Sequence, residues 1–259
     1  MILTELGAHP IIAHRGASGV APENTIEAFE LGLNQGADAL EFDVHLAACG
    51  TPVVIHDPTL GRTTSATGPV RLRTAAELAR CDAGFRFTTD GIGFPWRDRG
   101  VRVATLAEVL KRFPPVPLLI ELKTVEVAEP ARQVLLEHGA AGRVVLASFL
   151  HAALQPFRGG PFATSASRRS NLACWLRSWT GLRATGTDQA YSVPERFWKR
   201  IPVPTRAFIR AASRSGRPVH VWTVNDPARA AELWRNGVSG IISNFPALMV
   251  AERARVFGR

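Results

Sequence analysis

Short apolar runs rich in β-branched residues alternate with longer amphipathic stretches along almost the whole of this chain. The short runs are typical of buried β-strands, and the longer stretches are typical of helices. The strand candidates cover residues 10–14, 39–45, 118–123, 144–148, 162–165, 190–193, 219–224 and 240–243. The helix candidates cover residues 25–35, 105–113, 128–138, 151–157, 171–179, 205–215, 227–236 and 246–257. The chain therefore reads as a series of strand–helix units.

The number of units decides between the α/β architectures. Eight units in 259 residues predict a TIM (β/α)8 barrel, with residues 1–259 as a single domain, rather than an open doubly wound sheet. No G-x-G-x-x-G follows a strand, so nothing indicates a dinucleotide-binding fold.

One segment interrupts the alternation after the second strand. Residues 51–56 (TPVVIH) read as a further extended piece, and residues 57–103 are rich in Gly, Thr, Arg and Asp with little periodicity. A connection of this length is usually a functional loop or a small inserted subdomain. We expect residues 57–103 to form a small insertion over the barrel mouth.

The chain is basic, with 31 Lys and Arg against 22 Asp and Glu, which gives a net charge of +9. This charge favours anionic partners: nucleic acid, an acidic membrane surface or a phosphorylated small molecule. The arginines are scattered, with no run longer than Arg168-Arg169, which argues against nucleic acid. The three cysteines lack the spacing of a zinc site or a disulfide framework, and no leader or long apolar segment is evident, so we expect a cytoplasmic protein.

Carboxylates gather near the ends of the second and third predicted strands. Glu41 and Asp43 are two residues apart and so share one face, and Glu121 occupies the next strand with Lys123. Barrel active sites lie at the carboxyl ends of strands, and buried carboxylates repel each other unless a cation intervenes. Ion pairs such as Glu41 with Arg15 are the purely structural alternative. Three converging carboxylates favour an oxygen-ligand site for Mg²⁺ or Ca²⁺.

Two histidines also end extended segments, His14 in the first strand and His56 in TPVVIH. They are candidates for a general base and a general acid, with a hydrogen-bonded structural role as the alternative for each. Arg15 and Lys123 would supply positive charge to a phosphoryl group. Trp222 fits a pocket wall and the barrel core about equally. The remaining tryptophans of helical pattern are expected to pack in the core: Trp175, Trp179, Trp198 and Trp234.

At this point the sequence resembles the glycerophosphodiester phosphodiesterase family. The matching segments run in family order across nearly the whole chain and include AHRGASGVAPENTIEAFELGLNQGADALEFDVHL, PVVIHDPTLGRTT, TLAEVL, LLIELK, VVLASF, VHVWTVN and GVSGIISNFP. The resemblance implies a TIM barrel with a small insertion after the second strand. It also implies metal-dependent hydrolysis of a small-molecule glycerophosphodiester to glycerol 3-phosphate and an alcohol.

The resemblance also implies a role for each site residue, by motif position. The acid/base pair would be His14 and His56, and the divalent-metal ligands would be Glu41, Asp43 and Glu121. The residues in contact with substrate would be Arg15 and Lys123 at the phosphate and Trp222 at the glycerol side. Two departures lie in the last strand motif, where Ser239 and Asn244 replace aspartates that are common in the family.

Two other functions stay open at this point. The same site could act on lysophospholipids, as a lysophospholipase D-like enzyme, with insertion aromatics and the basic surface meeting lipid. These aromatics are Phe85, Phe87, Phe94 and Trp96, which we instead expect to pack the insertion. Alternatively, the barrel could bind phosphodiesters or an anionic membrane without catalysis. The order of the two histidines leans towards His56 as the acid, while the choice between Mg²⁺ and Ca²⁺, the head-group preference and the oligomeric state stay open.

Overall fold

The computed structural model describes residues 1–197 and 201–258, so Trp198 lies outside the described residues. The barrel strands are β1 (Ile11–His14), β2 (Ala39–Leu46), β4 (Leu118–Leu122), β5 (Val144–Ala147), β6 (Ala163–Thr164), β7 (Tyr191–Pro194), β10 (Val219–Trp222) and β11 (Gly240–Ser243). They pair in parallel in the order β6-β5-β4-β2-β1-β11-β10-β7. A parallel bridge between Ser165 and Ala190 joins the two ends of this order. The predicted barrel is confirmed.

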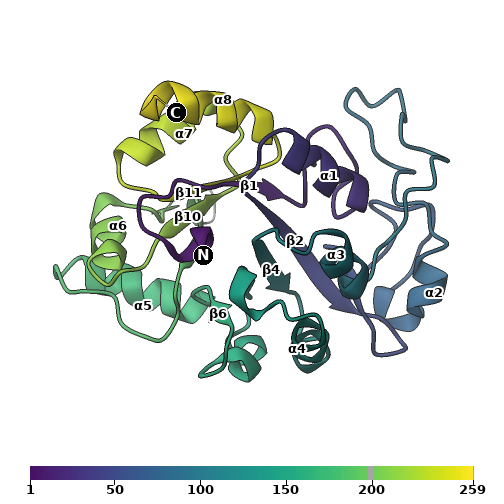
Figure 1. The fold of residues 1–259 in the computed structure, drawn as a ribbon, viewed down its shortest axis with the longest axis horizontal. Coiled ribbons are helices and arrows are strands. Elements are labelled where there is room, and N and C mark those ends of the chain that lie inside the picture. The colour runs from purple at the N-terminus through teal and green to yellow at the C-terminus, as the bar shows by residue number, and fades with distance from the viewer. Residues whose placement is uncertain (198–200, 259) are drawn as a thin grey trace.

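Helices surround the strands in a ring (Figure 1). They are α1 (Ile26–Asn34), α3 (Leu106–Arg112), α4 (Ala128–Glu137), α5 (Arg168–Ser178), α6 (Arg206–Ser213), α7 (Pro227–Arg235) and α8 (Pro246–Phe257). The unit after β5 differs from expectation, because His151–Phe157 is a 3-10 helix rather than an α-helix. Pro156 lies inside it and has no N–H to donate to an α-helical hydrogen bond. Short 3-10 turns also cover Ile2–Thr4, Val70–Leu72 and Ala141–Arg143.

Side-chain caps fix where several helices begin. Thr105 accepts from the Glu108 backbone N–H while Glu108 accepts from Thr105, which makes a capping box at the start of α3. Ser167 accepts from the backbone N–H of Ser170 and so starts α5 at Arg168, three residues earlier than the periodicity predicts.

The barrel interior is a packed core rather than a pore. One buried cluster fills it: Leu3, Ile12, Ala39, Leu119, Val145 and Ile242. Leu3 comes from the N-terminal 3-10 turn, and its carbonyl accepts a 2.8 Å hydrogen bond from Nε2 of His220 on β10. The N-terminus accordingly lies near the centre of the ring in Figure 1. The free space of the barrel is therefore at the carboxyl ends of the strands.

The insertion has a small core of its own. β3 (Pro52–Val54) pairs antiparallel with β2, and α2 (Ala75–Leu78) is a single short helix. The buried side chains include Val53, Ile55, Leu60, Val70, Leu78, Val101 and Val103. In Figure 1 this part of the chain lies beside the barrel, at the right, around α2. Its predicted position over the mouth stays a prediction.

Three of the four insertion aromatics, namely Phe85, Phe94 and Trp96, contact other residues of the insertion. The Arg97 guanidinium carbon lies 4.2 Å from the ring centroid of Phe85 and 3.9 Å from that of Phe94. Trp96 packs against the insertion core. This arrangement agrees with the packing role expected for these rings.

β8 (Arg196–Phe197) and β9 (Ile201–Pro202) form a separate two-stranded ribbon. Within the described residues, no helix is both long and apolar enough to cross a bilayer.

Candidate active site

A cavity of about 140 Å³ opens at the carboxyl ends of the barrel strands. Seven of the residues singled out from the sequence line it: His14, Arg15, Glu41, His56, Glu121, Lys123 and Trp222. The eighth, Asp43, is almost fully buried and contacts the cavity residues Arg15 and Lys123. The fold thus brings all eight candidates together.

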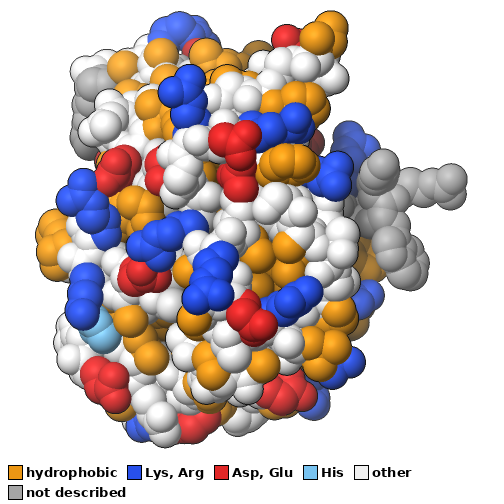
Figure 2. Space-filling model, turned by 90° about the vertical axis from the view of Figure 1, so that its right-hand side faces the viewer, with side chains coloured by type: hydrophobic (Ala, Val, Ile, Leu, Met, Phe, Trp, Pro, Cys, Tyr) orange, Lys and Arg blue, Asp and Glu red, His pale blue; other side chains and the backbone are white. Residues whose placement is uncertain are grey.

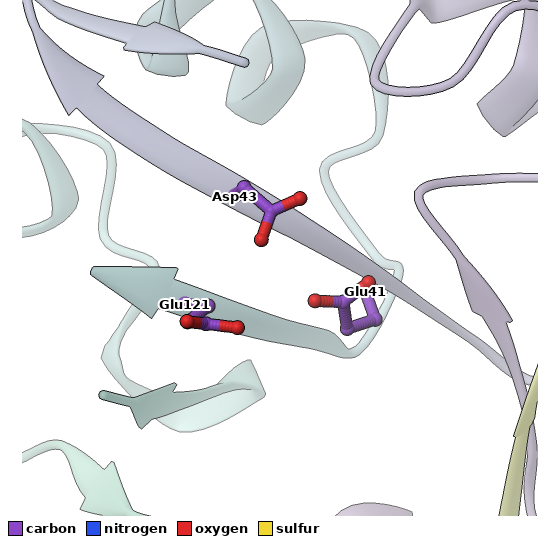
Figure 3. Close-up of side chains that lie close together, drawn as sticks. All are labelled: Glu41, Asp43 and Glu121. Carbon is purple, nitrogen blue, oxygen red and sulfur yellow. The ribbon is translucent and has the colours of Figure 1, made fainter. Parts of the chain in front are cut away.

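Strand register sets the positions of the three carboxylates. Glu41 of β2 is level with His14 of β1, and Asp43 of β2 is level with Glu121 of β4. Each of the three acids offers an oxygen within 4.8 Å of the others. Figure 3 shows the three side chains gathered between the two neighbouring strands. The arrangement is a candidate metal site built from oxygen ligands alone.

Asp43 is the best compensated of the three acids. Its carboxylate lies 2.9 Å from Nζ of Lys123 and 3.1 Å from Nε of Arg15, and it accepts a 2.9 Å hydrogen bond from the Asn24 side-chain amide. Burial alone would raise the pKa of Asp43, but Lys123 and Arg15 outweigh it and lower that pKa. Asp43 is therefore an ionised, fixed anion at neutral pH.

In the part of the chain that the structure describes, no lysine or arginine side chain forms an ion pair with Glu41. It accepts a 3.0 Å hydrogen bond from the Arg15 backbone N–H, whereas the Arg15 guanidinium pairs with Asp43 and Glu23 instead. Burial, with the negative charges of Asp43 and Glu121, holds the pKa of Glu41 well above its usual range. The ion pair of Glu41 with the Arg15 side chain, offered as the structural alternative, is not the observed contact.

The charge balance supports a cation at this site. Lys123 also lies 2.9 Å from Glu121, yet burial still raises the pKa of Glu121. Among the described residues, three clustered carboxylates thus share the side-chain charges of Arg15 and Lys123, and Glu41 is left without one. A hard divalent cation prefers carboxylate oxygens and would remove this deficit. The residues present therefore fit such an ion.

His14 is held by a neutral partner. Its Nδ1 lies 2.6 Å from Oδ1 of Asn244, which also accepts a 3.0 Å hydrogen bond from Ser18. An amide oxygen only accepts, so Nδ1 carries the proton and Nε2, 4.0 Å from Glu41, is left unprotonated. Burial, reinforced by the nearby Arg15 charge, lowers the pKa of His14 to about 4. The Asn244 departure from the family thus contacts one of the two histidines directly.

His56 is held by a charged partner. Its Nδ1 lies 2.6 Å from Oδ1 of Asp57, and Arg62 of the insertion donates a 2.6 Å hydrogen bond to the same carboxylate. Arg62 also donates to Glu23 at 2.7 Å. Hydrogen bonding from Arg62 lowers the pKa of Asp57 to about 2. Sequence reasoning missed this chain of contacts, although the position of Asp57 directly after His56 was a usable signal.

Trp222 both lines the cavity and contacts the barrel core. Its ring meets Phe149 edge to face, with centroids 5.9 Å apart and planes at 81°. Further lining residues that the sequence analysis did not select follow strands β5 and β6, lie within β7 or belong to α5: Ser148, Phe149, Ser165, Arg168, Asn171 and Ser192. Ser148, Phe149 and Ser165 share a usable signal, because each lies just beyond the carboxyl end of a barrel strand.

This chain is similar to known proteins over most of its length. The chain is 34% identical to YhdW of Bacillus subtilis (strain 168), over 93% of this chain and 97% of YhdW. It is 32% identical to the glycerophosphodiester phosphodiesterase of Caldanaerobacter subterraneus subsp. tengcongensis, over 93% of this chain and 96% of that protein.

A solved structure gives a similar match. The Oleispira antarctica phosphodiesterase OLEI02445, in complex with its product sn-glycerol-3-phosphate, superposes with a TM-score of 0.71 at 25% identity, covering 94% of this chain and 96% of that one. The sequence model of the glycerophosphoryl diester phosphodiesterase family matches residues 14–248. Because that match covers most of the chain and includes every candidate site residue, this protein is a member of the glycerophosphoryl diester phosphodiesterase family.

Proposed function

We propose that this phosphodiester hydrolase cleaves glycerophosphodiesters into glycerol 3-phosphate and an alcohol at the cavity described above. The observation that carries the proposal is the convergence of three carboxylates, two cationic side chains and two histidines on one cavity at the barrel's carboxyl end. Phosphodiester hydrolysis requires charge neutralisation at the phosphoryl group and proton transfer at both the attacking and the leaving oxygen. This set of residues can supply all three.

Glu41, Asp43 and Glu121 would hold the cation, which we propose to be Mg²⁺ or Ca²⁺ because every donor is a carboxylate. When bound, such an ion supplies positive charge to the phosphoryl oxygens. Arg15 and Lys123 flank the same carboxylates and line the cavity, so they can contact the remaining phosphoryl oxygens.

The different partners of the two histidines support different roles. His14, paired with the neutral Asn244, presents an unprotonated Nε2 and is suited to accept the proton of the attacking hydroxyl, from water or from the glycerol moiety. His56, whose Nδ1 lies 2.6 Å from the ionised Asp57, is suited to carry a proton to the leaving alcohol, because the carboxylate orients the imidazole ring. We therefore propose His14 as the base and His56 as the acid.

Activity measurements with glycerophosphocholine test the proposal. Excess chelator should abolish glycerol 3-phosphate release, and Mg²⁺ or Ca²⁺ should restore it. His14→Ala and His56→Ala should each lower kcat by at least about 10²-fold. His138→Ala is the matched control, because His138 lies at the end of α4 and, within residues 1–197 and 201–258, its side chain bonds only the Val134 carbonyl of its own helix. Full activity in excess chelator would overturn the metal assignment.

The lysophospholipid alternative stays a prediction that the same enzyme preparation can test. The ratio of kcat/KM for glycerophosphocholine to that for a lysophospholipid, measured below the lipid's micellar concentration, compares the two substrates at the same site. A ratio above one supports the glycerophosphodiester assignment, and a ratio below one reverses it. Absence of product from both substrates would leave a barrel that binds phosphodiesters without cleaving them.

A further inference from the structure

The excess positive charge of the chain comes from one continuous segment, residues 138–225. This segment contains thirteen Lys and Arg and only two acids, so its formal charge of +11 exceeds the +9 of the whole chain. The rest of the chain is therefore slightly acidic. Such charge asymmetry between parts of a chain indicates a surface that meets an anionic partner.

The two acids of this segment are already paired. Asp188 lies 3.4 Å from Arg158, and Glu195 lies 2.9 Å from Arg229. Exposed arginines with no salt bridge among the described residues follow in α5, α6 and their neighbouring loops: Arg168, Arg169, Arg183, Arg196, Arg206, Arg210 and Arg214. The face that carries the insertion differs, because acidic and basic side chains are interspersed over it in Figure 2.

Helix α5 and its C-cap residue carry three large apolar side chains on the outside of the molecule, although Trp175 packs partly against the core. The residues it buries are Cys174 and Ser178, whereas Leu172, Leu176 and Trp179 are 57%, 56% and 66% exposed. The core position expected for Trp179 is therefore wrong. Surface helices normally turn their large apolar residues towards the core. Leu182, in the loop after α5, is also half exposed. A contiguous apolar row of this kind indicates a surface that is covered by something other than water.

A second cavity, of about 150 Å³, lies where the end of α5 meets α6. Its lining combines the apolar Leu182 and Ala211 with the cationic Arg210 and Arg214. Arg214 donates a 3.3 Å hydrogen bond to the Gly181 carbonyl, which anchors its guanidinium to the loop between α5 and β7. Two arginines beside an apolar wall match a phosphate group attached to hydrocarbon.

This surface begins at the active-site cavity. Arg168 in the first turn of α5 lines the cavity, and Leu172 and Leu176 follow it at intervals of four residues, so all three lie along one side of the helix. In Figure 1, α5 and α6 lie at the left of the barrel, opposite α2 and the insertion. Whatever covers this side would therefore lie next to the cavity mouth.

We propose that the α5–α6 face, made of Leu172, Leu176, Trp179, Leu182, Arg210 and Arg214, docks on the surface of an anionic phospholipid bilayer. Leucines and a tryptophan would enter the interface, and arginines would meet the lipid phosphates. Nucleic acid offers no hydrocarbon to cover three leucines. A second copy of the chain would set one arginine-rich face against another. The proposal goes beyond the hydrolytic function and does not depend on it.

Vesicle flotation without substrate tests the proposal. The wild-type protein should bind vesicles of phosphatidylcholine with 30% phosphatidylglycerol at 0.1 M NaCl, bind pure phosphatidylcholine at least about 10-fold more weakly, and lose binding at 1 M NaCl. Arg210→Glu with Arg214→Glu should weaken binding on the order of 30-fold or more, because each interfacial cation contributes about fivefold. Leu172→Ser with Leu176→Ser should weaken it at least about 10-fold.

Matched controls come from the insertion. Leu72 and Ile92 are 62% and 84% exposed there, and Arg71 is exposed as well. Leu72→Ser with Ile92→Ser, and Arg71→Glu, should leave vesicle binding unchanged. All variants should keep wild-type turnover of water-soluble glycerophosphocholine, which shows that they fold and separates this proposal from the hydrolytic one.

Three results would overturn the proposal. The first is equal binding to neutral and anionic vesicles, or no binding to either. The second is an equal loss of binding in the insertion controls. The third is a different occupant: duplex DNA bound more tightly than anionic vesicles, or a dimer in solution that Leu172→Ser with Leu176→Ser converts to a monomer. A further result would support the proposal. Brominated lipid should quench the tryptophan fluorescence of the wild type more than that of Trp179→Phe, which would place Trp179 in the bilayer.

Discussion

The active-site cavity and the α5–α6 face differ in how their charged side chains are buried and paired. At the ends of β1, β2 and β4 the charged groups are mostly buried, and Lys123 is bonded at 2.9 Å to both Asp43 and Glu121. On the α5–α6 face the cations are exposed, and Arg210 and Arg214 make no salt bridge among the described residues. In the first region the charged side chains pair with one another around a small cavity. In the second region the described cations are unpaired and exposed, as docking on a large anionic surface would require.

The contrast has an energetic basis. Removing one member of a buried charge pair leaves the other uncompensated at low dielectric, which typically costs about 3–5 kcal/mol. An exposed charge is screened by water and salt, and its removal usually changes stability by less than about 0.5 kcal/mol. The two regions should therefore differ in how strongly single substitutions affect folding and activity, and in how strongly salt modulates the effect.

Lys123→Met should have the largest effect. It removes the cation that lies between Asp43 and Glu121 and that can contact the phosphoryl group, so kcat should fall about 10²- to 10³-fold. The free energy of unfolding without metal should fall by about 3 kcal/mol, and added Mg²⁺ should recover more stability in the variant than in the wild type. Steady-state kinetics and urea unfolding measure both.

Lys111→Met is the control for this prediction, because Lys111 is exposed on α3 and makes no salt bridge among the described residues. It should leave kcat and stability unchanged. Equal behaviour of the two variants would remove the distinction between buried, paired charges and exposed ones.

Arg62→Gln should have the next largest effect. Arg62 holds Asp57, which in turn holds His56, so its loss should lower kcat by about 10- to 100-fold. The same hydrogen bonds lower the pKa of Asp57 to about 2, so in the variant Asp57 should protonate at higher pH and the acid limb of the rate profile should move up. The exposed Arg71, also in the insertion, gives the control Arg71→Gln. A uniform loss of kcat at every pH would contradict the positioning role.

The residues at the strand ends could be predicted from the sequence, whereas Arg62 and the α5–α6 face could not. Glu41 and Asp43 could be placed on one face because side chains alternate along a strand, and the barrel then required Glu121 to lie beside them. Arg62 could not be placed, because residues 57–103 lack the periodicity that positions a side chain. The α5–α6 face could not be found from runs of cations, because its arginines are scattered along the sequence; the informative signal is the near absence of acids over residues 138–225.

The buried side chain of His220 should make the stability of the protein depend on pH. Burial lowers the pKa of His220 to about 4, below the value of about 6.5 expected in the unfolded chain. The unfolded state therefore binds protons first, and stability falls as pH drops from about 6.5 towards 4. Between pH 7 and pH 5 the wild type should lose about 2 kcal/mol more than His220→Gln, because the glutamine can still donate to the Leu3 carbonyl. Equal losses in urea unfolding would show that His220 does not titrate in this way.

The smallest expected effect is the most direct test of the α5–α6 face. Arg210→Ala should change the free energy of unfolding by less than about 0.5 kcal/mol, whereas Arg158→Ala should lower it by about 1–3 kcal/mol. Both arginines belong to the basic segment, but Arg158 lies 3.4 Å from the buried Asp188, whereas Arg210 has no acidic partner among the described residues. If Arg210→Ala destabilises the protein as much as Arg158→Ala, Arg210 has a structural role. If Arg210 is neutral for folding, its exposed charge is free to meet a ligand, and an anionic bilayer is the proposed ligand whose chemistry also accounts for the exposed leucines of the same face.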